Sequence, residues 1–278
     1  MDEPSNPPAL PPSLARVRRA IEATAEACLV LRAAGEPVGP AGTVLGGVPR
    51  MGQEWPRSPE RPMAFVGALD FAELARVAPG VLPWLPEAGR LLFFYDEDEQ
   101  RWGFDPEDRE WSRLVFVEGG EEAPATPPAA IAPHPSRRVR PVRAASFAAP
   151  MDARVPALEP AEWEAYSALH AAHQQEIHGH EWLRHQVGGN PDWIQDDARH
   201  EAALVAHGIR ADGPEAYATD EARRLEGEAA EWRLLWQVSS DEELGFTWGD
   251  VGHLYVLVRA DDLARRDFAR AQVVLQCT

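Results

Sequence analysis

Short apolar runs, each bounded by glycine, proline or acidic residues, recur along the chain and predict strands. The runs lie at 28–31, 63–69, 91–95, 114–117, 234–238, 254–258 and 273–275. After residue 136, arginines alternate in part with Val139 and Val142, a pattern typical of an exposed strand. The strands therefore fall into two groups, one in each half of the chain.

Apolar residues spaced three and four positions apart predict helices around and between these strands. Ser13 is a suitable N-cap for a short helix that carries Leu14, Val17 and Ile21. The other predicted helices run from 159 towards 183, over 194–207, over 214–231 and over 261–270. The second half is therefore expected to mix helices and strands.

Composition divides the chain into segments. Residues 1–12 are rich in proline and predict a disordered leader, and residues 119–136 have few large apolar side chains and predict a linker loop. We expect an N-terminal half-repeat over 13–118 and a C-terminal half-repeat over 137–278. The second of these would carry a helical insertion over 159–231.

The two halves share a weak internal repeat. The Gly-Gly-x-Pro turn at 46–49 returns at 188–191, and the Gly-x-strand pattern at 89–95 returns at 252–258. The fold class expected is α+β, with two similar β-rich units, flanking helices and one shared core. Chance recurrence of short glycine turns is the alternative explanation.

The charge of the chain excludes several functions. It carries 27 Lys plus Arg, every one of them arginine, against 45 Asp plus Glu, for a net charge of −18. An acidic chain argues against nucleic-acid and anionic-membrane partners and leaves a basic protein as a partner. Without lysine there is no Schiff base or P-loop chemistry. Two distant cysteines and no long apolar run predict a cytoplasmic protein.

Five histidines fall within sixteen residues, and they raise the question of a metal site. They are His170, His173, His178, His180 and His185. The histidine of 180–185 that would complete a zinc-protease motif comes one position too late. A solvated or core-edge helix is therefore favoured, and we expect neither a metal nor another cofactor.

The candidate binding residues are aromatic and polar side chains beside turns. They are Trp248, Asp250, Asp241, Gln237, Trp55 and Trp102. Asp241 and Asp250 flank one turn, where two carboxylates are able to act as acid and base if they share a pocket. The structural alternative, which we favour, is that both form the turn while Trp248 fills the core. We expect no catalytic residue.

Several segments, taken in order, resemble the YwqG-like bacterial family of unknown function. The most specific is 232–255, which reads WRLLWQVSSDEELGFTWGDVGHLY and contains a strand, an acidic turn and the Trp-Gly-Asp triplet. Others are 43–49, with its double glycine, and 185–195. The resemblance implies an α+β fold and a cytoplasmic bacterial protein without an established activity. Some relatives resemble components of toxin and immunity systems.

Two functions from different classes follow. The first is a non-enzymatic protein-binding module, specifically an immunity-type inhibitor of a basic toxin, because acidic charge accelerates association with a basic protein. The alternative is a small-molecule or metal-dependent enzyme that uses Asp241, Asp250 or the 170–185 histidines in a groove between the repeats. A scaffold role through self-association is a third hypothesis. The sequence does not predict an oligomeric state.

Overall fold

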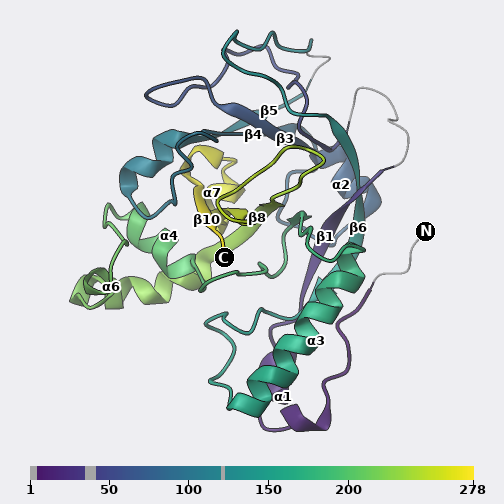
Figure 1. The fold of residues 1–278 in the computed structure, drawn as a ribbon, viewed down its shortest axis with the longest axis vertical. Coiled ribbons are helices and arrows are strands. Elements are labelled where there is room, and N and C mark those ends of the chain that lie inside the picture. Colours follow the sequence, from purple (N-terminus) through teal and green to yellow (C-terminus); the bar gives the residue numbers. More distant parts are fainter. Residues whose placement is uncertain (1–4, 35–41, 120–122) are drawn as a thin grey trace.

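One antiparallel sheet runs through the molecule in a computed structural model that describes residues 5–34, 42–119 and 123–278 (Figure 1). Its strands are β1 (Glu26–Ala33), β2 (Val44–Leu45), β3 (Ala64–Asp70), β4 (Arg90–Tyr95), β5 (Ser112–Val117), β6 (Arg137–Ser146), β7 (Gln186–Val187), β8 (Trp232–Ser239), β9 (His253–Arg259) and β10 (Gln272–Gln276). The order across this ten-stranded sheet is β10-β9-β8-β7-β1-β6-β2-β3-β4-β5. The expected mixture of helices and strands is confirmed.

The centre of the sheet joins strands that are distant in sequence. β1 pairs with β6 and β7, and β6 pairs with β1 and β2. From this central pair, β2 to β5 follow one another outward on one side, and β7 to β10 do so on the other. Both sides of the sheet therefore depend on a strand from the opposite half of the chain.

β6 differs from its prediction as an exposed strand. It lies between β1 and β2 near the middle of the sheet, with Val139 and Val142 buried. Two of its arginines are held by carboxylates, since Arg137 pairs with Asp241 and Arg138 pairs with Glu73. An arginine-rich strand is tolerated at this position because ion pairing offsets part of the desolvation of each guanidinium.

Short helices connect and flank the strands. The α-helices are α1 (Arg18–Glu22), α2 (Phe71–Val77), α3 (Pro160–His178), α4 (Arg199–Ala206), α5 (Pro214–Tyr217), α6 (Asp220–Leu225) and α7 (Ala260–Ala264). The 3-10 helices are η1 (Pro12–Leu14), η2 (Pro106–Trp111), η3 (Glu226–Glu231) and η4 (Phe268–Arg270). In the described chain, no helix combines the length and apolar character needed to cross a bilayer.

Two groups of helical segments lie apart from each other (Figure 1). α3 packs beside α1, where Tyr166 and Ile21 belong to one buried cluster. α3 ends earlier than predicted because Gly179 adopts a left-handed conformation with φ +67° and caps it. α4, α5, α6 and η3 form the second group, which contacts β8 through α4 and η3 and contacts β10 through α4.

Two double-glycine turns follow the shortest strands, β2 and β7. Gly46 and Gly47 have φ of +65° and +78°, and Gly188 and Gly189 have φ of +66° and +71°. The left-handed conformation suits glycine because it has no Cβ to clash with the backbone. Each turn lies next to a β-bulge. The turn after β2 lies beside the bulge between Phe65 and Gly67 in β3, and the turn after β7 lies beside the bulge between Leu234 and Trp236 in β8.

One hydrophobic cluster joins the two halves of the chain. It contains Leu45, Val66 and Phe93 from the first half, together with Trp236 and Val256 from the second. The rings of Phe93 and Trp236 are 5.9 Å apart between centroids. The expectation of one shared core agrees with this packing.

The predicted leader and linker are partly described. Residues 1–4 and 120–122 lie outside the described residues. Ser5 forms a parallel bridge with Ala144, and Leu10 is buried against the α1–α3 group. In the linker, Ile131 packs against the cluster that contains Trp55. These contacts attach the described parts of both segments to the rest of the fold.

A segment from the opposite half covers each outer strand. The Leu275 amide of β10 donates a hydrogen bond to the Trp102 carbonyl at 3.0 Å. At the other end, the ring of Phe268 lies 5.4 Å from that of Phe116 in β5. Gly103 permits the first approach, because a Cβ there would lie 2.2 Å from the Val273 carbonyl oxygen. Each outer strand is therefore in contact with a segment from the opposite half of the chain.

Candidate functional site

Trp102 lines a hollow of about 560 Å³ beside β10 and η2. Trp102 is 42% exposed, which places it among the exposed large hydrophobic residues of the described chain. The ring stacks on Phe104, with centroids 6.3 Å apart and an angle of 19° between the planes. An exposed tryptophan stacked on a second aromatic ring therefore lines the hollow.

Local hydrogen bonds fix the backbone that carries Trp102. The hydroxyl of Tyr95 donates to the Arg101 carbonyl at 2.8 Å. Asp108 accepts from the amides of Gly103 and Asp105, at 3.0 and 3.2 Å, and completes a capping box at the start of η2. Because the first turn of η2 is closed in this way, the aromatic pair lies on a defined support rather than on a free loop.

The rim of the Trp102 hollow is predominantly acidic. Glu107 and Glu110 have exposed side chains with no ion pair in the described part of the chain. Arg210 contacts the carboxylates of Asp105 and Asp212, at 3.3 and 2.7 Å. Arg101 lies over the Trp111 ring, 4.6 Å from its centroid. An exposed indole with unpaired carboxylates nearby is suited to an ammonium or guanidinium group.

The structure separates the other candidate residues. Trp248 is fully buried and packs against Tyr95, with centroids 5.7 Å apart. Trp55 lies in a different cluster, where its indole donates to the Met63 carbonyl at 2.8 Å. Gln237 is buried and holds two backbone groups, the Asp192 amide and the Arg184 carbonyl. In this arrangement Trp248, Trp55 and Gln237 support the fold.

Asp241 and Asp250 have different surroundings. The Asp250 side chain is exposed, and its backbone carbonyl accepts from the Thr278 hydroxyl at 2.8 Å. The Gly249 amide beside it donates to the Gln100 side chain at 2.7 Å, which connects the Trp-Gly-Asp turn to the segment before Trp102. Asp241 is buried and pairs with Arg137. This geometry favours a turn-forming role for the Asp241 carboxylate, whereas Asp250 contributes its backbone carbonyl.

His185 orients the Asp241 carboxylate. The Ser239 amide donates to His185 Nδ1 at 3.2 Å, so Nε2 carries the proton of the neutral ring and donates to Asp241 at 3.3 Å. Burial lowers the pKa of His185. Burial alone would raise the pKa of Asp241, but the hydrogen bonds from His185 and Arg137 and the charge of Arg137 outweigh it and lower that pKa to about 2. Asp241 is therefore ionised near neutral pH.

The clustered histidines do not converge on one point. His170, His173, His178 and His185 are buried, whereas His180 is exposed and receives the amides of Trp182 and Leu183. Burial lowers the pKa of His170 and His178. Within the described residues, no group of three histidine, cysteine or acidic side chains is arranged to hold a metal ion.

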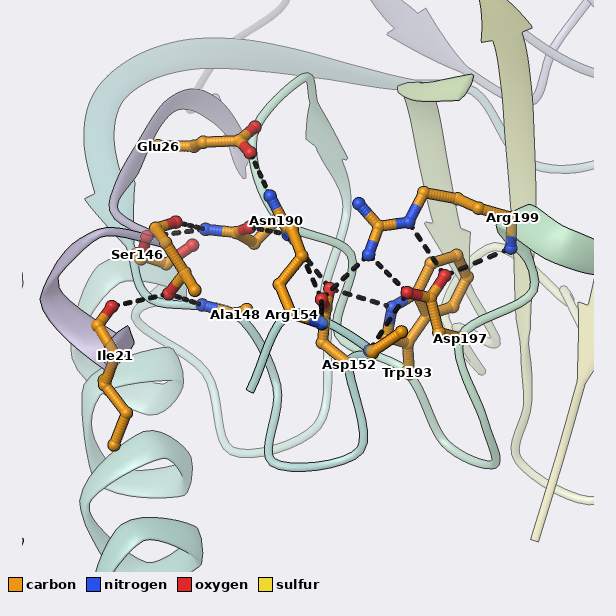
Figure 2. A network of polar contacts seen from close by, with 12 residues as sticks. Ile21, Glu26, Ser146, Ala148, Asp152, Arg154, Asn190, Trp193, Asp197 and Arg199 are labelled. Carbon is orange, nitrogen blue, oxygen red and sulfur yellow. Dashed lines mark hydrogen bonds and ion pairs between the residues drawn. The ribbon is translucent and has the colours of Figure 1, made fainter. Parts of the chain in front are cut away.

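A second polar region lies where α4 meets the loop after β6 (Figure 2). Asp152 has a side chain with no exposed surface, and it accepts from Arg154 Nε and Arg199 Nη2, both at 2.8 Å. Arg199 also pairs with Asp197, and Arg154 pairs with Glu26. The network therefore connects the start of β1, the loop and α4 through two arginines that share one buried carboxylate.

Sequence patterns did not indicate the hollow next to this network. It has a volume of about 610 Å³ and is lined by Arg154, Arg199, Glu201 and Tyr217, among others. The Tyr217 hydroxyl donates to Glu201 Oε1 at 3.0 Å, while Glu201 Oε2 is buried with no hydrogen-bond partner. Burial, with smaller contributions from nearby aspartates, raises the pKa of Glu201 to about 7 despite the hydrogen bond from Tyr217.

Replacing Glu201 with glutamine is expected to stabilise the protein more at pH 8 than at pH 5. Because the folded-state pKa, about 7, exceeds the unfolded value, the unfolded state loses this proton first as the pH rises. The carboxyl group therefore lowers the free energy of unfolding progressively between about pH 4.5 and 7. Glutamine removes this cost, with an expected gain of about 1–3 kcal/mol at pH 8. Urea denaturation at both pH values measures it, and an equal gain at both would contradict the assignment.

The profile of the family described as "Domain of unknown function (DUF1963)" matches residues 43–277, which is most of the chain. The chain belongs to the DUF1963 family. No curated protein matches the chain at a significant level. The DUF1963 match includes both hollows, the Asp241 turn and the Trp-Gly-Asp triplet. It begins after β1, although β1 occupies the centre of the sheet.

Within the DUF1963 region, sequence reasoning missed the site residues that depend on tertiary contacts. Glu201 and Tyr217 lie on α4 and α5, and no motif connects them. Asp152 and Arg199 were also overlooked, because an Asp and an Arg distant in sequence carry no signal of pairing. Trp102 was found through its position beside a turn, and it is the candidate that lies most openly in a hollow.

Proposed function

We propose that this DUF1963 protein is a non-enzymatic binding module that receives a basic side chain of a partner protein in the Trp102 hollow. The observation that carries the proposal is the exposed indole of Trp102, stacked on Phe104 beside the unpaired carboxylates of Glu107 and Glu110. A cation over an indole face gains about 0.5–2 kcal/mol, and carboxylates around it add charge complementarity.

The charge of the whole chain supports the same class of partner. A net charge of −18 attracts a basic protein over a distance and accelerates its association. We propose that the partner is a basic toxin and that the chain acts as its immunity-type inhibitor. This identification of the partner rests on the charge of the chain and on its resemblance to YwqG-like proteins. Membership of the YwqG-like group is itself a proposal, because the family match establishes only DUF1963.

A cytoplasmic location is part of the same proposal. The chain has two free cysteines, Cys28 and Cys277, and Cys28 is buried. Burial raises the pKa of the Cys28 thiol to about 12, so this thiol is unreactive near neutral pH. Thiols kept reduced are typical of a reducing compartment.

Replacing Trp102 with alanine is expected to weaken the binding of a capped tripeptide with a central arginine by about 3- to 30-fold, the equivalent of a lost cation–π contact. Trp163→Ala is the matched control, because the Trp163 side chain is 44% exposed and lies on α3, outside the hollow. Nuclear magnetic resonance titration at 50 mM NaCl measures both affinities. Replacing the arginine of the peptide with citrulline tests the charge.

The proposal fails if the tripeptide binds equally well to Trp102→Ala, Trp163→Ala and the unchanged protein. It also fails if citrulline binds as well as arginine. Co-purification with a candidate basic toxin at low salt extends the test to a whole partner. There the Trp102→Ala variant is expected to retain less toxin than the Trp163→Ala variant.

We also propose that the two halves arose by duplication of one β-rich unit. Support comes from matching backbone contacts at the two double-glycine turns. The Gly46 amide donates to the carbonyl of Val66 at 2.8 Å, and the Gly188 amide donates to that of Leu235 at 3.3 Å. Val66 and Leu235 each lie at the β-bulge of their strand.

A second pair of contacts repeats around the same turns. Thr43 Oγ1 accepts from the Asp70 amide at 3.3 Å, and His185 Nδ1 accepts from the Ser239 amide at 3.2 Å. Each acceptor lies three residues before the first glycine of its turn, and each donor ends its strand. The domain division at 13–118 and 137–278 is proposed on this basis. An experimental structure in which the two units do not superpose, strand for strand, would overturn it.

A further inference from the structure

The Glu201 hollow is separate from the Trp102 hollow and differs in construction. α4 contributes Arg199 and Glu201, α5 contributes Tyr217, and the loop before α3 contributes Arg154. Its volume of about 610 Å³ is sufficient for a small organic molecule. No residue lines both this hollow and the one that contains Trp102.

The two arginines of the Glu201 hollow are already paired. Arg154 is held by Asp152, Glu26 and Asn190, and Arg199 by Asp152 and Asp197 (Figure 2). Their positive charges are therefore largely offset by adjacent carboxylates. They form one wall of the hollow and are poorly suited to attract an anionic ligand.

The other carboxylates that line the Glu201 hollow are not neutralised by a cation in the described part of the chain. Asp196 and Glu226 are exposed at the hollow and have no ion pair in the described part of the chain. Glu201 has one hydrogen bond, from Tyr217, and its Oε2 is buried without a partner. A carboxylate in this position, when ionised, is an incompletely compensated buried charge. A cation in the hollow would compensate it.

We propose that the Glu201 hollow binds a small organic amine or guanidine, with its positive charge beside Glu201 and Tyr217. The Tyr217 hydroxyl donates its hydrogen bond to Glu201 Oε1 at 3.0 Å, with the Ala211 carbonyl as a second acceptor at 3.3 Å, so its oxygen lone pairs are available to accept from the ligand. The Tyr217 ring adds an aromatic surface for a cation. The ligand class follows from this charge balance and does not depend on the function proposed for Trp102.

The pH dependence follows from the groups that face Glu201. The charged and titratable residues around the hollow are Arg154, Asp196, Asp197, Arg199, His200, Tyr217 and Glu226. The His200 Nε2 proton is donated to the Ala222 carbonyl at 3.0 Å, so Nδ1 is the unprotonated nitrogen of the neutral ring. Glu201 is half protonated near neutral pH, and a bound cation favours its ionised form. Binding is therefore expected to release a proton between pH 6 and 7.

Isothermal titration calorimetry with phenethylamine and agmatine tests the proposal. At pH 8, Glu201→Gln is expected to weaken binding of both probes by roughly tenfold, which corresponds to one charge-assisted contact. In the unchanged protein, affinity is expected to rise from pH 5.5 to 8, and this rise is expected to disappear in the variant. Titration in two buffers of different ionisation enthalpy measures the released proton directly.

Two controls keep the outcome interpretable. 3-Phenylpropionate has nearly the shape of phenethylamine but the opposite charge, and it is expected not to bind. Glu215→Gln changes a glutamate that lies on α5 and does not line the hollow, and this variant is expected to leave the affinity unchanged. Circular dichroism checks that each variant is folded. If Glu201→Gln does not fold, Tyr217→Phe serves as the second variant.

The proposal is overturned if neither amine binds to the folded, unchanged protein at 10 mM. Equal affinity of the unchanged protein and Glu201→Gln at pH 8 overturns it as well, as does equal binding of the amine and the carboxylate. Because Trp102 lies in the other hollow, Trp102→Ala is expected to leave amine binding unchanged. Failure here is therefore distinguishable from failure of the Trp102 proposal.

Discussion

Replacing Asp152 with asparagine is expected to lower the free energy of unfolding by about 3–5 kcal/mol, the usual cost of breaking a buried ion pair from one side. The Asp152 side chain has no exposed surface and accepts from Arg154 and Arg199. Burial favours its neutral form, but the arginines outweigh this effect and lower its pKa, so the group is ionised when folded. An amide leaves two guanidinium groups facing a neutral side chain.

Guanidinium chloride denaturation at pH 7 measures this loss. Asp220→Asn is the matched control, because the Asp220 side chain is 95% exposed and also pairs with an arginine. Its expected cost is below about 1 kcal/mol, as for other surface ion pairs. A quadruple variant, Asp152→Leu with Arg154→Met, Arg199→Met and Asp197→Asn, is expected to recover part of the stability because it removes the buried charges of the network together. Similar losses in Asp152→Asn and Asp220→Asn would refute the role of burial.

Replacing Asp241 with asparagine is expected to cost about 3 kcal/mol at pH 7. The carboxylate pairs with Arg137, which has little exposure, and accepts the proton of His185 Nε2. Its second oxygen accepts the amides of Glu243 and Leu244, at 3.1 and 3.3 Å, and so closes the acidic turn. An asparagine side chain retains part of the hydrogen bonding but not the charge opposite Arg137.

The same substitution is expected to remove an acid-sensitive contribution to stability. The folded-state pKa of Asp241, about 2, lies below its unfolded value, so the unfolded state binds the proton first as the pH falls. The contribution is complete above about pH 4 and is lost as the pH falls towards 2. Urea denaturation at pH 7, 4 and 2.5 compares the variant with Asp250→Asn, whose side chain is exposed. An unchanged acid dependence in Asp241→Asn would count against this assignment.

Local patterns were sufficient to predict most of the sheet. The apolar run at 254–258 lies within β9, and the run at 91–95 lies within β4, because strands buried on both faces are apolar throughout. β2 and β7 were missed because two residues are too few to form a pattern. The environment of β6 was misjudged, since the carboxylates that neutralise Arg137 and Arg138 come from distant segments.

A candidate site was predictable from the sequence only where its residues lie together in one short segment. Trp102 belongs to a short stretch that also contains Phe104, Glu107 and Glu110, so its aromatic and acidic character is visible in the sequence. The Glu201 hollow depends instead on how α4, α5 and η3 pack, and Glu201 resembles any helical glutamate in the sequence. Its unusual proton affinity arises from burial, which becomes apparent only in the folded chain.

The pairing of β1 with β6 and β7 constrains how the protein is made on the ribosome. β1 emerges before either neighbour, because neither exists until β6 has been synthesised roughly 100 residues later, after about 5–20 s of translation. β2 also lacks one neighbour during this interval. The nascent chain therefore carries unpaired apolar strands for seconds, and completion of the sheet is a late, long-range step during which chaperones would protect the exposed strands.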